Sequence, residues 1–245
     1  MGAVGVKTTS GSSLVNQPSA EAEKYTEFDD HGGADKWFAN EKLSNFSEWR
    51  TGLSDAEYKA LKSYTGGGYS SMNSSLYGIP WDEMSATQKA KMAALYDAIS
   101  RFELKKGINV TRKADFQIFG AKDTYSQMTV DQIKDFLKQT NGVVQNDGFM
   151  SFSADPRGRG INGNSVVIHL RIPPSKGAGA YVNPISSNMG EMEYVLNTNA
   201  VLKFDTNSVE KKSDGKIHVT ADWLGQAQMQ TIDPKNKSVH AKKKS

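Results

Sequence analysis

The chain has no cysteine among its 245 residues. This absence excludes disulfide bonds and thiolate metal sites, and it leaves the redox compartment of the protein undetermined. Histidine is also scarce, and the four histidines lie far apart without the spacing of metal ligands: His31, His169, His218 and His240. We therefore predict that the protein binds no metal ion.

Long apolar runs are missing as well. No stretch approaches the roughly 20 apolar residues that cross a bilayer, and the N-terminal residues contain no apolar core of a secretory signal peptide. Val6 stands where a myristoylation signal requires serine or threonine. We expect no membrane span, and export by the general secretory route is not visible in the sequence.

Positive charge is in only small excess: the chain has 30 basic and 27 acidic residues and a net charge of +3. Part of the basic excess lies in the lysine run of segment 237–245, which we interpret as a basic tail and not as a nucleic-acid surface. Residues 1–22 lack hydrophobic periodicity and predict a flexible tail. We expect residues 23–236 to form a single domain and the protein to be a monomer without nucleic-acid partners.

The first half of the chain has helical signals. A Ser-x-x-Glu capping box at 54–57 begins a helix that runs toward the glycine-rich 65–68, and a second helix follows from Tyr69 toward Gly78. Apolar residues at helical spacing predict a third helix over 85–102, with Gly107 as its stop. Thr129 caps a fourth helix, which ends at 141–142.

The hydrophobic period changes in the second half. We predict strands over 108–112, 148–153, 165–172, 180–182, 191–196, 200–205 and 216–220. Helices that precede a mostly antiparallel set of strands are typical of an α+β fold.

Two glutamates, Glu191 and Glu193, stand at the end of a loop rich in Ser, Asn and Gly. If a strand begins at Glu191, both carboxylates point to the same face of it. Such a pair can divide labour, since one acid stabilises a developing positive charge and the other orients or deprotonates a nucleophile. An isolated Glu-x-Glu is more often a solvated loop edge, so the assignment depends on the other motifs.

Two further motifs stand upstream. Arg112 ends an alternating segment, where a guanidinium can hold pyrophosphate oxygens at the mouth of a cleft, although a strand-end arginine is usually only a surface charge. Ser151 and Ser153 fall on one face of the next strand, with Phe152 on the other. Serine pairs are common in ordinary strands, so neither motif carries a function alone.

In this order, the arginine, the Ser-x-Ser pair and the Glu-x-Glu pair resemble the NAD-dependent mono-ADP-ribosyltransferases of bacterial toxins. Segment 53–78 is similar to the N-terminal helices of clostridial binary-toxin enzyme components, vegetative insecticidal proteins and Rho-modifying exoenzymes, through Tyr64, Tyr69 and Asn73. The resemblance covers approximately 27–225. It implies a helical segment followed by a two-sheet β core around an NAD cleft.

The resemblance also implies the NAD contacts. Tyr64, Tyr69 and Asn73 would form one wall of the cleft, although Tyr64 can equally be a packing residue between two helices. Arg112 would contact NAD phosphate. In the loop that would cover NAD, either Arg157 or Arg159 could reach phosphate, and we assign this contact to Arg159.

The serines and the acids complete the implied site. Ser151 would position the catalytic Glu193, and Ser153 would contribute to NAD binding. Glu193 would bind the nicotinamide-ribose hydroxyl and stabilise the positive charge that develops as nicotinamide leaves. Glu191 would face the incoming side chain. Asn188 replaces an aromatic residue that this loop often carries in the family.

Members with Glu-x-Glu modify arginine, whereas the Rho-modifying exoenzymes carry glutamine at the upstream position and modify asparagine. The difference has a physical reason, because a guanidinium stays protonated near neutral pH and needs a carboxylate to hold it and accept its proton. The resemblance therefore implies transfer of ADP-ribose to an arginine, with eukaryotic actin as the expected target.

Other functions stay open. The target can be a small GTPase or a bacterial protein. An NAD glycohydrolase would need Arg112, Ser151 and Glu193 but not Glu191, because its acceptor is water. An inactive binding module, like the adaptor half of binary toxins, would lack the acid pair.

The chain contains one transferase-sized unit, so entry into a target cell would need a separate delivery component or a secretion apparatus. We expect the protein to be secreted or injected and to act in the target-cell cytoplasm.

Overall fold

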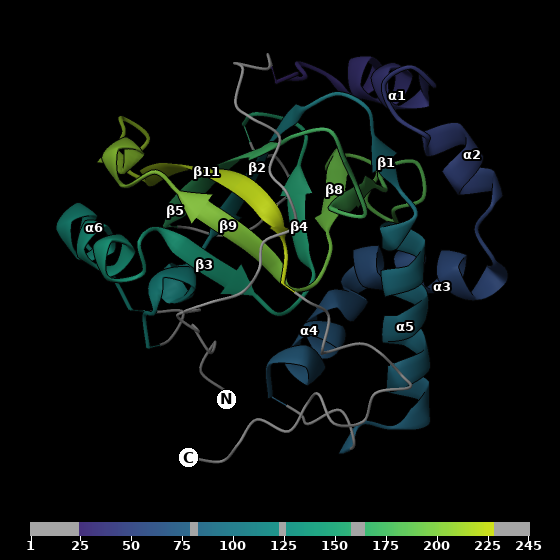
Figure 1. The fold of residues 1–245 in the computed structure, drawn as a ribbon, viewed down its shortest axis with the longest axis horizontal. Helices are drawn as coiled ribbons and strands as arrows, with labels where there is room; N and C mark the ends of the chain where they lie inside the picture. The colour runs from purple at the N-terminus through teal and green to yellow at the C-terminus, as the bar shows by residue number, and fades with distance from the viewer. Residues whose placement is uncertain (1–24, 79–82, 123–125, 158–164, 228–245) are drawn as a thin grey trace.

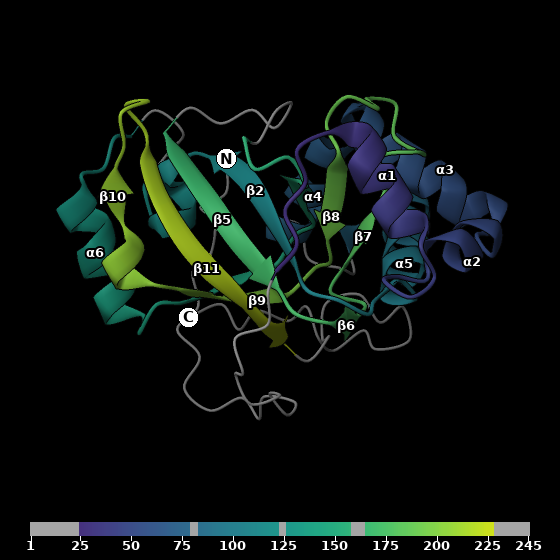
Figure 2. The same ribbon diagram turned by 90° about the horizontal axis from the view of Figure 1, so that it is seen from above.

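The computed structural model describes residues 25–78, 83–122, 126–157 and 165–227. The predicted tails at 1–22 and 237–245 lie outside these ranges, as does Arg159, so the domain boundaries stay predictions. Within the described residues, a group of helices lies at one end of a large sheet and α6 (Val130–Gln139) lies at the other end (Figures 1 and 2).

The helices follow in chain order, with three short helical turns labelled η. They are α1 (His31–Ala39), α2 (Phe46–Thr51), α3 (Asp55–Ser63), η1 (Tyr64–Gly68), α4 (Tyr69–Gly78), α5 (Ala86–Ser100), η3 (Phe116–Phe119), α6 (Val130–Gln139) and η4 (Thr206–Ser208). The predicted capping box is confirmed at Ser54, whose side chain accepts from the Glu57 amide while the Glu57 side chain accepts from the Ser54 amide. Equivalent boxes begin α5 and α6.

The predicted third helix over 85–102 is confirmed as α5, which ends at Ser100. Between this end and Gly107, Glu103 and Leu104 form a short strand that pairs with Lys176 and Ser175. Helices α1 and α2 were not predicted, since Gly32 and Gly33 lie in the first turn of α1 and α2 has only six residues. None of the helices in the described ranges is long and apolar enough to cross a membrane.

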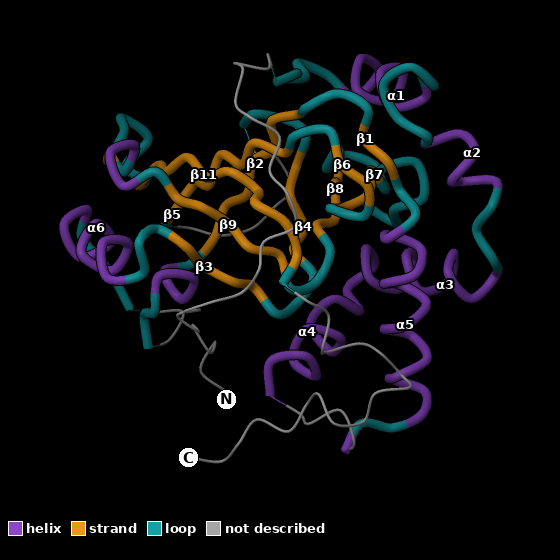
Figure 3. The backbone as a smooth tube through the Cα atoms, in the orientation of Figure 1, coloured by secondary structure: helices purple, strands orange, loops and turns teal. Residues whose placement is uncertain are grey.

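The strands confirm a mostly antiparallel α+β fold, drawn in orange in Figure 3. They are β1 (Glu103–Leu104), β2 (Ile108–Ala114), β3 (Val143–Asn146), β4 (Met150–Ser153), β5 (Val166–Ile172), β6 (Ser175–Lys176), β7 (Gly179–Tyr181), β8 (Glu193–Leu196), β9 (Ala200–Phe204), β10 (Glu210–Lys211) and β11 (Ile217–Gln226). In the described residues, the main sheet has the order β3-β9-β11-β5-β2-β4-β8-β7, and β10 pairs with β11. The β5–β11 pair is parallel.

The main sheet consists of two halves. We call β3-β9-β11-β5-β2 the large half and β4-β8-β7 the small half. The halves meet between β2 and β4, where the described register contains the single pair Thr111–Ser153. The expected two-sheet core is therefore one sheet that is nearly divided at this junction, with the separate two-stranded β1–β6 sheet beside it.

The two halves are buried differently. β5 alternates, with Ile168, Leu170 and Ile172 in the core and His169 and Arg171 more exposed, as expected for a strand with one solvated face. All residues of β7 and β8 are buried. Helices cover the small half, since the ring of Tyr181 in β7 stacks on Phe38 of α1 with 3.9 Å between centroids.

Candidate active site

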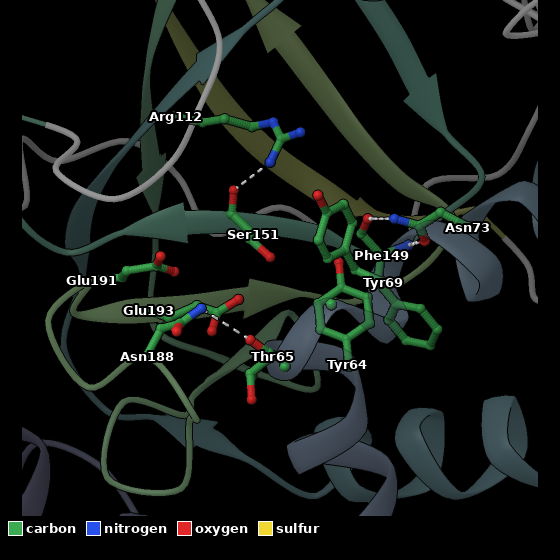
Figure 4. A pocket seen from close by; sticks show the side chains of 12 residues that line it. Tyr64, Thr65, Tyr69, Asn73, Arg112, Phe149, Ser151, Asn188, Glu191 and Glu193 are labelled. Atoms are coloured by element: carbon green, nitrogen blue, oxygen red, sulfur yellow. Dashed lines mark hydrogen bonds between the residues drawn. The ribbon is translucent and has the colours of Figure 1, made fainter.

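A cavity of about 320 Å³ lies between the η1–α4 segment and the strands β4 and β8 (Figure 4). It brings together seven of the predicted site residues, namely Tyr64, Tyr69, Asn73, Arg112, Ser151, Glu191 and Glu193. Ser153 lies outside the described lining, and Arg159 lies outside the described residues. The lining also includes residues that were not predicted for it, namely Thr65, Gly66, Gly67, Phe149 and Asn188.

The helical wall depends on a kink between α3 and α4. Gly67 has φ of 104°, a left-handed conformation that glycine adopts without steric cost. The two tyrosines on either side of the kink differ in burial: Tyr64 is 1% exposed, whereas Tyr69 is 54% exposed. Tyr64 packs edge-on against Phe149, with 5.7 Å between ring centroids, and also lines the cavity. The packing role and the site role considered for Tyr64 therefore coexist.

The Tyr64 hydroxyl is a neutral group in this wall. Burial raises its pKa, while hydrogen bonds with Ser151 and Asn73 and the charge of Arg112 oppose the rise. A neutral hydroxyl can donate a hydrogen bond to an oxygen in the cavity.

Asn73 fastens the helical wall to the strands. Its Nδ2 donates to the Phe149 carbonyl oxygen at 2.9 Å, and its Oδ1 accepts from the Phe149 amide at 3.0 Å. A Cβ at the preceding Gly148 would lie 2.8 Å from Asn73 Oδ1 and 2.6 Å from the Tyr77 hydroxyl, so this approach requires glycine. Asn73 thus holds α4 against the start of β4.

Arg112 lies beside β4. Its Nη1 donates to the Ser151 carbonyl oxygen at 2.6 Å. Figure 4 shows Arg112 and Glu193 on opposite sides of Ser151. The site therefore presents a cation on one side of Ser151 and an acid on the other.

Glu193 is the first residue of β8 and is 3% exposed. Burial raises the pKa of this carboxyl to about 7, and the charge of Glu191 adds to the rise. Hydrogen bonds from Ser151 and Ser186 and the charge of Arg112 act in the opposite direction. The Ser186 hydroxyl donates to Glu193 Oε2 at 3.3 Å.

Glu191 has a different environment. It lines the same cavity but is only half-buried, and this burial raises its pKa. The predicted strand over 191–196 is wrong at its start, because β8 begins at Glu193 and Met192 has φ of 49°. A left-handed residue between the two acids breaks the alternation on which the shared strand face was based. Both acids nevertheless reach the cavity.

Ser153 holds the backbone at Glu191 and does not line the described cavity. Its side chain is fully buried, its hydroxyl donates to the Glu191 carbonyl oxygen at 2.6 Å, and the hydroxyl oxygen accepts from the Asp155 amide at 3.1 Å. Ser151, and not Ser153, contributes to the described lining.

Arg157 contacts residues that do not contribute to the described lining of the cavity. Its guanidinium contacts the Asp155 carboxylate through Nε at 2.8 Å and the Asp29 carbonyl oxygen through Nη2 at 3.0 Å. It does not contribute to the described lining of the cavity.

The loop before Glu191 closes the cavity against the helical wall. Asn188 Nδ2 donates to the Thr65 carbonyl oxygen at 3.3 Å, and the Ser187 amide donates to Thr65 Oγ1 at 3.4 Å. The Asn188 amide donates to Ser186 Oγ at 3.0 Å. The two contacts with Thr65 join residues more than 120 positions apart, so no local motif in the sequence could have indicated them.

This chain belongs to the ADP-ribosyltransferase exoenzyme family, whose profile matches residues 36–226. The resemblance that the motifs indicated is thereby confirmed, and the chain is a member of a family of bacterial toxins that transfer ADP-ribose. No curated protein matches the chain.

Solved structures show the same fold. Plx2a, an ADP-ribosyltransferase toxin from Paenibacillus larvae, is 24% identical with a TM-score of 0.68, and the match covers 80% of this chain and 98% of that chain. The C3 exoenzyme of Clostridium limosum is 19% identical with a TM-score of 0.65, over 82% of this chain and 98% of that chain. The ADP-ribosylating toxin BECa of a C. perfringens binary enterotoxin is 19% identical with a TM-score of 0.65, over 82% of this chain and 50% of that chain.

Proposed function

We propose that this protein is an NAD-dependent mono-ADP-ribosyltransferase that modifies an arginine of a target protein and releases nicotinamide. The observation that carries the proposal is the unequal acid pair, in which a buried Glu193 and a half-buried Glu191 line one cavity with Arg112.

The lining has the chemistry that NAD requires. Arg112 offers a guanidinium for pyrophosphate, Tyr69 offers an exposed aromatic ring, and Glu193 offers a carboxylate for a ribose hydroxyl. A volume of about 320 Å³ lies within the range of roughly 300–1,000 Å³ that is common for ligand pockets. The solved structure of BECa contains NADH, and that of a similar protein from S. aureus contains NAD.

Glu193 would act on the bond that breaks. NAD supplies the ADP-ribose group and nicotinamide as the leaving group. The carboxylate of Glu193 would stabilise the positive charge that develops on the ribose, and Ser151 and Ser186 would hold this carboxylate through hydrogen bonds. Charge stabilisation requires the ionised carboxylate. Because the pKa of Glu193 is about 7, activity should fall as the pH drops below about 7.

Glu191 would act on the acceptor. Its carboxylate would hold the arginine guanidinium and accept one proton from the attacking nitrogen. The ribose bond to nicotinamide breaks with its electron pair on nicotinamide, and a new bond forms between the ribose carbon and the arginine nitrogen. Alignment in a cavity would favour this acceptor over water.

The proposed target is eukaryotic actin, with a small GTPase or a bacterial protein as the other outcomes. Support for an arginine acceptor comes from the carboxylate at position 191, because the resemblance associates glutamine there with asparagine modification. The protein would be secreted or injected, with a separate delivery component or a secretion apparatus.

The test is transfer of labelled ADP-ribose from NAD to proteins of a eukaryotic cell lysate, followed by mass spectrometry of the labelled band. The wild type should label an arginine, and neither Glu191→Gln nor Glu193→Gln should do so. Labelling of another residue type would contradict the arginine assignment. Release of nicotinamide without any labelled protein would favour the glycohydrolase or a bacterial target.

A further inference from the structure

The peptide between the two acids is held in an uncommon conformation. Met192 is a long, fully buried residue with φ of 49°, whereas most left-handed positions carry glycine or asparagine. Such a conformation persists where the surroundings determine it, and it often marks a functional site. The Met192 amide donates to the side-chain Oδ1 of Asn183 at 3.0 Å.

Asn183 is itself fixed by the first helix. It is almost fully buried, and its Nδ2 donates to Asp35 Oδ1 at 3.4 Å. The hydroxyl of Tyr181 donates to the same Asp35 oxygen at 2.6 Å. Because the carboxylate only accepts, the amide nitrogen of Asn183 faces Asp35 and its oxygen faces Met192. The orientation of Asn183 is therefore specified from α1.

The two acids depend on this contact to different degrees. Glu193 pairs with Ser153 in the β4–β8 ladder, and its carbonyl oxygen accepts from the Val182 amide at 2.9 Å. Glu191 precedes β8, and its backbone is held by Ser153 Oγ and by an amide contact to the Asn188 carbonyl oxygen at 3.2 Å. If the Asn183 contact is lost, the peptide between residues 191 and 192 can rotate more easily than the backbone of Glu193, which the β4–β8 ladder holds.

We propose that Asn183 is a positioning residue that sets the carboxylate of Glu191 relative to that of Glu193, and that Asp35 of α1 specifies its orientation. The inference rests on the proposed function, because it assigns acceptor positioning to Glu191 and bond cleavage to Glu193. Asn183 does not contribute to the described lining of the cavity and acts through the backbone.

The test compares Asn183→Leu with the exchanged pair Asp35→Asn plus Asn183→Asp. Leucine has a similar size but accepts no hydrogen bond, whereas the exchanged pair keeps an acceptor for the Met192 amide and a donor–acceptor contact between positions 35 and 183. Two rates are measured in folded protein: nicotinamide release without an acceptor, and ADP-ribose transfer to an arginine-containing acceptor. The KM for NAD is measured with both.

Asn183→Leu should reduce transfer by up to about 100-fold, the size of effect that a misplacement of about 1 Å can cause. Its nicotinamide release and KM for NAD should stay close to the wild-type values, and the exchanged pair should restore transfer. Asn183→Ala, which also removes the side-chain acceptor of the Met192 amide, carries the same expectation and replaces Asn183→Leu if the leucine variant does not fold.

Equal loss of both rates in folded protein would overturn the inference, as would unchanged transfer in Asn183→Leu or a failure of the exchanged pair to restore it. A wild type that releases nicotinamide but transfers nothing to arginine would instead refute the proposed function.

Discussion

The two halves of the main sheet differ in the length of their ladders and in their burial. In the large half, β2 and β5 pair over seven positions and β5 and β11 over six, and β5 and β11 alternate between core and more exposed positions. In the small half, β4 and β8 pair over four positions, and β7 and β8 are buried throughout. The small half also carries Glu193, whose ionised form is costly to bury.

The difference indicates that the large half supplies stability and the small half carries the chemistry. Regular ladders are favourable when their apolar face is buried in the core, as it is in β5. In the small half, β8 instead begins with a buried acid, directly after the left-handed Met192. Both need support from Ser153, Ser186 and Asn183. Mutations in the two halves should therefore separate activity from stability.

The largest effect is expected for Glu193→Gln. Nicotinamide release should fall by about 10²–10³-fold, as when one electrostatic stabiliser is removed from an active site. The variant should also be more stable above pH 7. The folded-state pKa of about 7 lies above the usual 4.5, so the folded protein loses stability as pH rises through this window, by on the order of 3 kcal/mol.

Thermal unfolding at pH 8 and nicotinamide release measure both consequences for Glu193→Gln. A variant with wild-type turnover and a lower melting temperature would reverse the assignment of this residue.

Leu170→Ala, in the large half, should lower stability without changing NAD binding. Leu170 is fully buried in β5, and its truncation should lower the free energy of unfolding by about 2–5 kcal/mol. The KM for NAD should not change at temperatures where the variant is folded, because Leu170 does not contribute to the described lining. Denaturant unfolding and NAD kinetics check this, with Lys211→Ala on exposed β10 as a control. A changed KM would show that the halves are not independent.

An effect of intermediate size is expected in the pH dependence of nicotinamide release. The kcat/KM reports the free enzyme, so it should fall as pH drops below about 7, where Glu193 becomes protonated. In Glu191→Gln this acid limb should move to lower pH, because the charge of Glu191 raises the pKa of Glu193. An acid limb that stays in place or moves upward would show that the two carboxylates do not interact.

The smallest effect concerns the two histidines of the large half. His169 Nε2 lies 2.9 Å from His218 Nδ1, and His218 Nε2 lies 3.1 Å from Asp214 Oδ2. Burial lowers the pKa of His169, and His218 and Lys212 lower it further, while the charge of Glu27 opposes them. Because the folded-state pKa lies below the unfolded value, the stability associated with neutral His169 is lost as pH falls below about 6.5.

The melting temperature of His169→Gln should therefore fall less than that of the wild type between pH 7 and pH 5. Equal falls in both proteins would exclude His169 as the titrating group.

Local signals in the sequence predicted most of the fold. The capping boxes at Ser54 and Thr129 indicated two helix starts, and alternating apolar residues indicated seven of the described strands. The strands β1, β3, β6 and β10 were not predicted. The first helix was not predicted because Gly32 and Gly33 in its first turn are poor helix formers. The Asp30 cap and the packing of Phe38 on Tyr181 compensate for them. Tertiary packing overrides propensity there.

The site was predictable in composition and less so in geometry. Motif order indicated Arg112, Ser151, Glu191 and Glu193, all of which line the cavity. No sequence rule places a methionine in a left-handed conformation, so the turn at Met192 could not be foreseen. The hydroxyl of Ser153 contacts a backbone carbonyl 38 positions away, which only the folded chain reveals.

The most direct test of the proposed division of roles measures two products in one reaction: nicotinamide, and the ADP-ribose adduct of a small guanidine compound supplied as the acceptor. The wild type should form both products. In Glu191→Gln, nicotinamide release should remain largely intact while the guanidine adduct disappears. Equal loss of both products in that variant would contradict the separate roles of the half-buried and the buried glutamate.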